Sequence, residues 1–512
     1  MPAKKGIKDS ARLVVLLVSV FIIATCGILY ELLISTISTY FLGSSVLHFS
    51  ITIGLFMSFM GVGSYLSKFI NDHLLERFVF IEILLGVVGG CSALVLYFSH
   101  SLTENYHLVA FLIISALGTF IGLEIPLVAR IINQYTTLKD TLAQVLSFDY
   151  IGALIASIVF PLLLLPYFGT MRTAFLIGIL NLSVAAFNAQ VFRDILKNAV
   201  PLRNASIVLM AVLAVGFAYS FKITTFFEQF VYQDEIILTR QSAYQRVVLT
   251  RWNNDFRLYL NGALQFSTVD EHRYHETLVH VPMQQVRNHE RVLLLGGGDG
   301  LAAREILKYA DVVHLDVVDL DAAVTDLGKN NPIFKNINHN SFNNPKVKIY
   351  NQDAFNFVKN ASDLYSVVII DLPDPNDPTL GKLYSREFYN LVAKCLTADG
   401  LMATQATSPY FATDTFWCIA HTVRSAFGRA IPYTTYVPSF GQWGFIMASK
   451  NPGPRVVPAF SAWLKLRYLN AKVYENIFDF DPDMADRPTE VNRLDNQIVV
   501  QLYEQSLKNW QE

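Results

Sequence analysis

Long apolar segments fill the first part of the chain and alternate with short polar connections. Most of them approach the roughly 20 residues that a helix needs to cross a bilayer. The last is the shortest, and the sequence FKITTFFEQF that follows it is typical of an interfacial segment. The pattern predicts a transmembrane domain over residues 1–221, with helices at 13–36, 47–70, 78–99, 107–129, 142–166, 171–191 and 204–221.

The pattern changes near Lys222, where apolar and polar residues alternate as they do in strands. The alternation is clearest in IILTRQSAYQRVVLTRW and FRLYLNGALQFS, and Asn261-Gly262 is a hairpin-turn dipeptide. These residues predict a small β-domain over 222–288.

Short apolar runs separated by helical patterns follow His289, namely RVLLLG, VVHLDVV, VKIY, SVVIID and GLMATQ. This spacing is typical of βαβ units in a doubly wound parallel sheet, and we expect such an α/β Rossmann-like domain over residues 289–450. Residues 451–512 mix prolines, aromatics and charges, and we expect them to pack on that domain as an extension.

Composition supports a membrane protein, because only 16% of residues are charged and the mean hydropathy is +0.35. The net charge of -2 provides no basic field for nucleic acid. Four widely spaced cysteines form no CxxC pair and are expected to be buried apolar residues: Cys26, Cys91, Cys395 and Cys418.

Basic residues occur in alternate connections, starting with Lys4, Lys5, Lys8 and Arg12 in the N-terminal tail. The positive-inside rule therefore places the N-terminus in the cytoplasm. Glu31, Glu124 and Asp149 lie within apolar segments that carry no Lys or Arg at similar depth. Each acid is compatible with a cation or proton path, and equally with a protonated carboxyl that holds neighbouring helices together.

A glycine-rich run, GGGDG, follows the first predicted strand of the α/β domain. Gly296 and Gly298 would let the backbone turn tightly and approach a ligand, although glycines needed only for packing would look the same. The run does not complete GxGxxG, and Asp299 puts negative charge where a pyrophosphate would rest. These residues favour a cationic ligand over a dinucleotide.

Carboxylates also follow the other predicted strands. Asp319 lies at the position from which an acid binds ribose hydroxyls, and Asp353 could accept from an adenine amino group or cap the next helix. Asp371 and Asp374 lie in DLPDPNDP, which favours an organic cation or magnesium, whereas Asp377 fits a solvated turn. Since the carboxyl ends of parallel strands share one edge, a single acidic cleft is expected there.

These pieces together resemble the polyamine aminopropyltransferases (spermidine synthases), particularly their membrane-bound bacterial branch. The resemblance covers residues from about Ser242 to Lys450 and includes SAYQRVVLT, LNGALQ, DEHRYHE, GGGDG, VDLD, DLPDP, KLYSREFY and VPSFGQWGF. It implies transfer of the aminopropyl group of decarboxylated S-adenosylmethionine to putrescine or a related amine, without a metal or prosthetic group. A homodimer is the oligomeric state that we would expect.

The resemblance also implies roles for individual residues. Asp371 resembles the general base. Contacts to the nucleoside are expected from Gln245, Gly296, Gly298, Asp319, Asp353, Ala354 and Pro378, and contacts to the amine from Tyr274, His275, Asp299, Asp374 and Gln265.

Two departures from the family pattern concern Leu301, where a glycine is usual, and Pro438-Ser439-Phe440-Gly441, which is shorter than the PTYPSG of soluble members and lacks its Tyr hydroxyl. The second departure leaves the amine undetermined.

An S-adenosylmethionine-dependent methyltransferase would share the sheet and the ribose acid, but it would need neither Gln245 and Gln265 nor the Asp371/Asp374 pair. A polyamine transporter or sensor with a ligand-binding C-terminal domain is the alternative from another class.

The resemblance conflicts with the predicted helix count. Seven spans with the N-terminus inside would put the catalytic domain outside, yet its co-substrate is made in the cytosol. Either segment 204–221 fails to span or the enzyme faces the periplasm. Of the two, we expect a protein of the bacterial inner membrane with a cytoplasmic catalytic domain.

Overall fold

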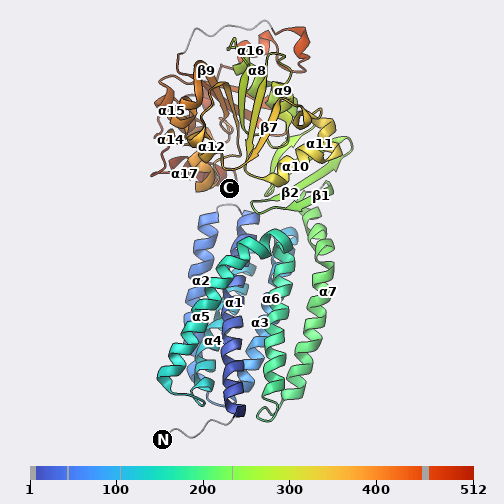
Figure 1. Cartoon of the computed structure of the whole chain (residues 1–512), viewed down its shortest axis with the longest axis vertical. Coiled ribbons are helices and arrows are strands. Elements are labelled where there is room, and N and C mark those ends of the chain that lie inside the picture. The colour runs from blue at the N-terminus through green and yellow to red at the C-terminus, as the bar shows by residue number, and fades with distance from the viewer. Residues whose placement is uncertain (1–6, 43–44, 104, 233, 452–459, 512) are drawn as a thin grey trace. The chain divides into compact units, whose positions relative to one another are not determined.

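The computed structural model describes residues 7–42, 45–103, 105–232, 234–451 and 460–511. Lys4 and Lys5 lie outside the described residues. The chain forms two compact units, Met1–Ile236 and Ile237–Glu512, of which the first is helical and the second contains the sheets (Figure 1).

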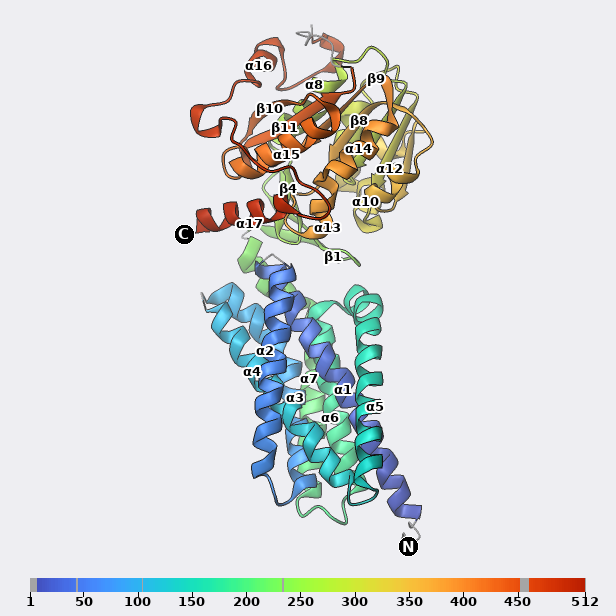
Figure 2. The ribbon, with the colours of Figure 1, turned by 90° about the vertical axis from the view of Figure 1, so that its left-hand side faces the viewer.

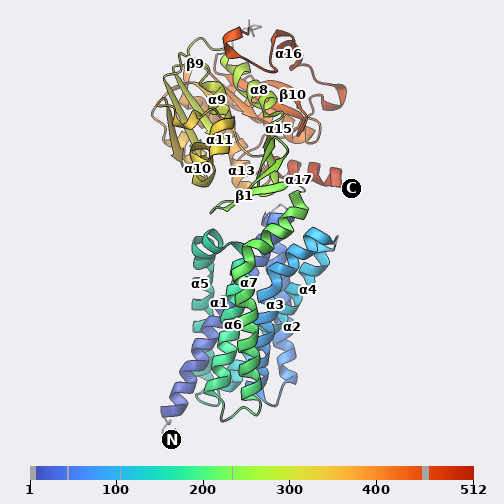
Figure 3. The same ribbon diagram turned by 90° about the vertical axis from the view of Figure 1, so that its right-hand side faces the viewer.

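The helical unit is built around its first helix, α1, which contacts every other helix of the bundle except α7 extensively. Leu16, Tyr30, Leu33 and Ile37 of α1 are buried and lie along one face of this helix. Figures 2 and 3 show the neighbouring helices around it. The bundle consists of α1 (Ile7–Leu42), α2 (Ser45–Leu66), α3 (Leu74–Leu102), α4 (Tyr106–Ile132), α5 (Leu138–Val159), α6 (Leu165–Val191) and α7 (Ala199–Tyr232).

Within its described residues, the bundle contains six continuous helices that are long and apolar enough to cross a membrane. One of them, Leu138–Val191, has 54 residues, because a π-helical turn at Phe160–Leu164 joins α5 to α6. A straight helix of that length would measure about 80 Å, against about 30 Å for the bilayer core. Gly169 breaks it with φ 68° and ψ −175°. Figure 1 shows the chain turning back between α5 and α6. The segments predicted at 142–166 and 171–191 are therefore the two arms of one kinked helix.

The predicted boundary at residue 221 lies inside helix α7, which continues to Tyr232. FKITTFFEQF, expected to be interfacial and to open a β-domain, is helical, because its alternation is too short to override an apolar helix already under way. Strands begin only at Glu235. The helix has 34 residues and is a candidate span by length and composition, whereas segment 204–221 was expected not to span; whether it spans stays a prediction.

A four-stranded sheet opens the second unit, in the order β1-β2-β3-β4. Its strands are β1 (Glu235–Gln241), β2 (Arg246–Trp252), β3 (Asp255–Leu260) and β4 (Ala263–Ser267). Asn261 and Gly262 link β3 to β4 with φ values of 49° and 84°, the backbone that a two-residue hairpin requires. The predicted hairpin is thus confirmed. Val247, Leu249 and Phe266 form one apolar cluster with Val324 and Leu327 of helix α10 (Ala322–Asn330).

The large sheet has seven strands in the order β10-β11-β9-β8-β5-β6-β7. β5 to β9 pair in parallel, whereas β11 pairs antiparallel with both β9 and β10. The strands are β5 (Arg291–Gly296), β6 (His314–Asp319), β7 (Val347–Asn351), β8 (Tyr365–Asp371), β9 (Leu396–Gln405), β10 (Ile431–Val437) and β11 (Gly441–Ser449). The order reverses between β5 and β8, where doubly wound sheets bind their ligands.

Helices cover both faces of this sheet. One face packs against α12 (Ala354–Asn360), α14 (Arg386–Cys395), α15 (Thr413–Phe427) and α17 (Ile498–Gln511). The other packs against α8 (Glu271–Met283), α9 (Leu301–Ile306) and α16 (Ala471–Asn476). The remaining short helices are α10 (Ala322–Asn330), α11 (Pro332–Ile337) and α13 (Pro378–Gly381).

The C-terminal extension contacts the α/β core at several points. Glu276 of α8 accepts hydrogen bonds from the backbone N–H groups of Arg467, Tyr468 and Leu469 at 2.7 to 2.9 Å. Trp417 donates to the carbonyl of Met484 at 3.0 Å. A buried carboxylate satisfied by three backbone donors fixes this segment against the domain.

Candidate active site

The glycine loop after β5 lies against the ends of two neighbouring strands. Gly296 has φ 84°, and a Cβ there would lie 1.9 Å from the carbonyl oxygen of Asp371. A Cβ on Gly298 would lie 2.5 Å from an Asp319 carboxylate oxygen. Only glycine permits both approaches, so the loop brings the acids of β6 and β8 together.

Asp319 is held by backbone donors at the end of β6. Gly298 and Asp321 donate to its two oxygens at 3.1 and 2.9 Å. Burial raises its pKa to about 7, since these bonds offset only part of the desolvation. Gln245 lies close by, because its side chain donates to Asp321 at 2.9 Å.

Asp353 caps helix α12 by accepting from the N–H of Asn356 at 2.9 Å. Its other carboxylate oxygen lies 2.7 Å from Lys382 Nζ, in the turn that follows Pro378. Ala354 is the buried first residue of the capped helix. The capping expectation is confirmed, and the ion pair ties Asp353 to the segment that begins at Pro378.

Asp371, at the end of β8, accepts a hydrogen bond from the Tyr274 hydroxyl at 2.6 Å. Burial raises the pKa of Asp371, while the positive charge of His275 and the Tyr274 hydrogen bond oppose that rise. His275 acts on Asp299 as well, because burial raises the pKa of Asp299 to about 6 and the positive charge of His275 opposes that rise. Tyr274, His275, Asp299 and Asp371 therefore form one interacting group.

His275 carries the positive charge of this group. Its Nδ1 lies 2.8 Å from the Glu271 carboxylate, which Arg304 also binds at 2.9 Å. Although burial alone would lower it, the hydrogen bond and charge of Glu271 raise the pKa of His275 to about 9. A protonated His275 would moderate the mutual repulsion of the carboxylates in the cleft.

Asp374 lies one turn of loop beyond Asp371 and accepts from neutral donors. Tyr503 donates at 2.9 Å, Thr407 at 3.3 Å and Gln405 at 3.4 Å. Burial raises the pKa of Asp374 to about 6, and these hydrogen bonds oppose the rise. Asp377, by contrast, caps α13 through the N–H groups of Thr379 and Leu380.

Three other features singled out in the sequence remain: Gln265, Leu301 and the turn at 438–441. Gln265 donates to the carbonyl of Ala263 within β4, and no hydrogen bond between the described residues links it to the acids. Leu301 is buried in the apolar cluster beneath the small sheet and donates its N–H to Asp299 at 2.8 Å, so the departure from glycine keeps the acid in place. Ser439 is bound by the Asp270 carboxylate, which anchors the short 438–441 turn on α8.

Comparison with known proteins bears on this group of acids. Residues 271–457 match the family model described as the spermine/spermidine synthase domain. The chain is 43% identical to a polyamine aminopropyltransferase of Leptospira interrogans over 96% of this chain and 98% of that one. It is 42% identical to polyamine aminopropyltransferase 2 of Ralstonia nicotianae, over 96% and 97% of the two chains. This chain belongs to the polyamine aminopropyltransferase family. A crystal structure of a spermidine synthase with the transition-state analogue AdoDATO is 26% identical and covers 48% of this chain and 86% of that one, with a TM-score of 0.46.

Membership in this family makes the protein an aminopropyltransferase rather than a methyltransferase. The similarity to the curated relatives extends over nearly the whole chain, so it includes the apolar helices as well as the catalytic domain. The family model covers the Tyr274, Asp299, Asp371 and Asp374 region but ends before Tyr503.

Sequence reasoning missed several residues of the cleft. Tyr503, Gln405 and Thr407 bind Asp374, while Glu271 binds His275. Glu271 could have been found, because it precedes His275 by one helical turn in DEHRYHE. Tyr503 gave no such indication, because it lies far along the chain in an extension without a recognised motif.

The acids of the helical unit differ in environment. Glu124 is buried and lies within hydrogen-bonding reach of Glu82, a fully buried acid of α3 that sequence reasoning missed. The four carboxyl oxygens of Glu82 and Glu124 are buried and have no hydrogen-bond partner among the described residues. Glu31 and Asp149 are only half-buried. The two carboxyls, one from α3 and one from α4, therefore lie close together inside the bundle.

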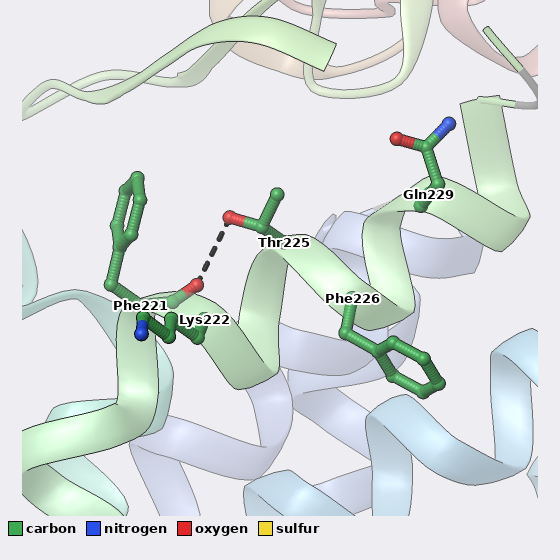
Figure 4. A pocket seen from close by; sticks show the side chains of 5 residues that line it. All are labelled: Phe221, Lys222, Thr225, Phe226 and Gln229. Carbon is green, nitrogen blue, oxygen red and sulfur yellow. Dashed lines mark hydrogen bonds between the residues drawn. The ribbon is translucent and has the colours of Figure 1, made fainter. Parts of the chain in front are cut away.

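A separate hollow of about 330 Å³ lies on helix α7 and is lined by Phe221, Lys222, Thr225, Phe226 and Gln229 (Figure 4). Thr225 donates to the carbonyl of Phe221 at 3.0 Å, as the dashed line shows. None of the acids of the cleft lines this hollow, which offers mainly apolar surface.

Of the cysteines, Cys26, Cys395 and Cys418 are buried as expected, whereas Cys91 is half-buried. All four are free thiols.

Proposed function

We propose that this aminopropyltransferase moves the aminopropyl group of decarboxylated S-adenosylmethionine to putrescine or a related amine, giving spermidine and methylthioadenosine. The observation that carries the proposal is the group formed by Tyr274, His275, Asp299 and Asp371 at the ends of β5 and β8. It combines a buried carboxylate with others suited to holding a cationic amine.

The reaction requires an unprotonated amine nitrogen, which attacks the aminopropyl carbon attached to the sulfonium. As the new C–N bond forms, the C–S bond breaks and its electron pair returns to sulfur, leaving neutral methylthioadenosine. The nitrogen must lose a proton, and Asp371 is the general base that accepts it. Its raised pKa makes it a better base than an exposed aspartate.

The amine is positioned by the neighbouring carboxylates in this proposal. Asp299 and Asp374 attract the distal ammonium, while Tyr274 orients Asp371. His275 lies against Glu271 and contributes its charge to the pocket wall. Gln265 is proposed at the outer end of the amine site.

The nucleoside occupies the other half of the cleft. Asp319 accepts from the ribose hydroxyls, with Gln245 beside it, and the backbone at Gly296 and Gly298 approaches the ligand closely. Asp353, Ala354 and Pro378 are proposed at the adenine, where the Asp353–Lys382 pair fixes one wall. A homodimer stays a prediction.

An assay of the purified full-length protein tests this proposal directly. We expect decarboxylated S-adenosylmethionine and putrescine to give methylthioadenosine and spermidine, with slower release from diamines whose carbon chain is longer or shorter. S-Adenosylmethionine serves as the control co-substrate, because a methyltransferase would convert it to S-adenosylhomocysteine. Formation of that product, or methylthioadenosine release that is independent of every amine tested, would contradict the proposal.

We also propose that the helical unit anchors the protein in a bacterial inner membrane with the catalytic domain in the cytoplasm, where the co-substrate is made. The six long apolar helices support the anchor. The start of α1 and the end of α7 lie at opposite ends of the bundle (Figures 1 and 3). If the catalytic domain after α7 is cytoplasmic, the N-terminal tail and the basic connections at its end of the bundle must lie outside the cytoplasm. This orientation is against the positive-inside rule.

Reporter fusions at both termini test this orientation. We expect a fusion after residue 512 to be active with a cytoplasmic reporter and a fusion before residue 1 with a periplasmic one. The opposite pair of results would mean that the charge distribution sets the topology and that the catalytic domain lies outside.

A further inference from the structure

Helix α17 extends the active site with a residue that the matched family domain does not include. The Tyr503 hydroxyl donates to Asp374 at 2.9 Å, although the two residues lie 129 positions apart. The family model ends at residue 457, so this contact comes from the C-terminal extension. The extension is therefore connected to the acidic cleft and does more than cover the sheet.

The start of α17 is fixed by packing on the α/β core. Val499 and Val500 are buried in the cluster that also contains Tyr384 and Phe388. Asn492, fully buried, donates to the carbonyl of Gly381 at 3.0 Å and accepts from the N–H of Val499 at 3.3 Å. Tyr503 lies one turn beyond these anchors, so the position of its hydroxyl is set by the core.

The donors around Asp374 are all neutral. Tyr503 and Thr407 bind one carboxylate oxygen, and Gln405 binds the other. Neutral donors orient a carboxylate and favour its ionised form without cancelling its charge. The negative charge of Asp374 therefore stays available to a cationic ligand.

We infer that Tyr503 is a positioning residue for the amine. Tyr503 acts by holding Asp374 ionised and directed toward the amine site. This inference rests on the proposed role of Asp374 as an amine contact. It makes the C-terminal helix part of the amine half of the site and leaves the nucleoside half unaffected.

Tyr503→Phe tests the inference in the full-length protein, because it removes the hydroxyl and keeps the ring packing. We expect the KM for the amine to rise about tenfold or more, as for loss of a hydrogen bond to a charged group, while the KM for decarboxylated S-adenosylmethionine stays the same. The Tyr503 hydrogen bond lowers the pKa of Asp374. Its loss should therefore move the acidic limb of the kcat/KM profile for the amine to higher pH.

Three further variants separate the possible outcomes. Gln505→Ala changes an exposed residue of the same helix and should leave both KM values unchanged. Asp374→Asn should raise the amine KM, and adding Tyr503→Phe to it should have no further effect. A full additional effect in the double variant, or equal losses of cofactor and amine binding in Tyr503→Phe, would overturn the inference.

The failure of the inference can be told from the failure of the proposed function. If Asp374→Asn raises the amine KM but Tyr503→Phe does not, Tyr503 has no positioning role and Asp374 keeps its own. If Asp374→Asn leaves the amine KM unchanged, the proposed amine contact is wrong, and the role inferred for Tyr503 is wrong with it.

Discussion

Asp371→Asn should lower turnover by a factor on the order of 10² to 10⁴, because an amide cannot accept the amine proton. The side chain keeps its size and can still accept from Tyr274, so nucleoside binding should change little. Single-turnover formation of methylthioadenosine measures the chemical step, and equilibrium titration with the nucleoside measures binding. Turnover within about threefold of the unmodified enzyme would remove Asp371 from the role of general base.

Two companion variants make this result specific. Asp363→Asn alters an exposed acid that pairs with Arg291, and it should leave turnover unchanged because surface ion pairs contribute little. Tyr274→Phe removes a hydrogen bond that lowers the pKa of Asp371. Activity requires ionised Asp371 and is lost as pH falls through its pKa, so the acidic limb of the kcat profile should move to higher pH in this variant.

Asp319→Ala should weaken binding of decarboxylated S-adenosylmethionine by about 100-fold, with a much smaller effect on the amine. Two ribose hydroxyls would lose a charged acceptor, and each such hydrogen bond contributes about 1.5 to 3 kcal/mol at most. Calorimetric titration of the full-length protein with methylthioadenosine, which retains the ribose, would measure the change. A less than threefold rise in the cofactor constant together with loss of amine affinity would contradict the nucleoside assignment.

The pH dependence of binding provides a second measure for Asp319. Burial raises its pKa to about 7, and hydroxyl donors would favour its ionised form. Nucleoside affinity should therefore fall as the pH is lowered through 7 in the unmodified protein, and this dependence should be absent from Asp319→Ala. The matched control is Asp326→Ala. Asp326 is an exposed residue of α10 that pairs with Arg240 of β1.

The sequence alone determined the order of the two halves and most strands of the catalytic domain. The runs RVLLLG and SVVIID coincide with β5 and β8, because buried parallel strands are continuously apolar and bounded by residues that end them. The Asn261-Gly262 turn was equally predictable, since both positions need positive φ. Local chemistry fixes such elements.

Boundaries between elements of similar hydrophobicity were not determined locally. FKITTFFEQF fits a helix or an interfacial strand, and only continuation of α7 to Tyr232 decided between them. The predicted gap between segments 142–166 and 171–191 contains Gly169, but the sequence did not show that the helix continues through residues 138–191 with only a kink there. Whether a helix continues depends on the helix that precedes the segment and on the residues that pack against it. A short stretch of sequence does not contain that information.

The acids of the cleft were predictable because strand ends meet at one edge of a parallel sheet, as Asp299, Asp319 and Asp371 do. Their partners were decided by the tertiary structure. Tyr503 reaches Asp374 across 129 positions, and Glu82 meets Glu124 across two helices. Such contacts depend on how separate elements pack, whereas strand pattern and turn chemistry depend on neighbouring residues. The sequence by itself therefore determined which strand ends carry acids. The packing of the elements decided which residues each acid contacts.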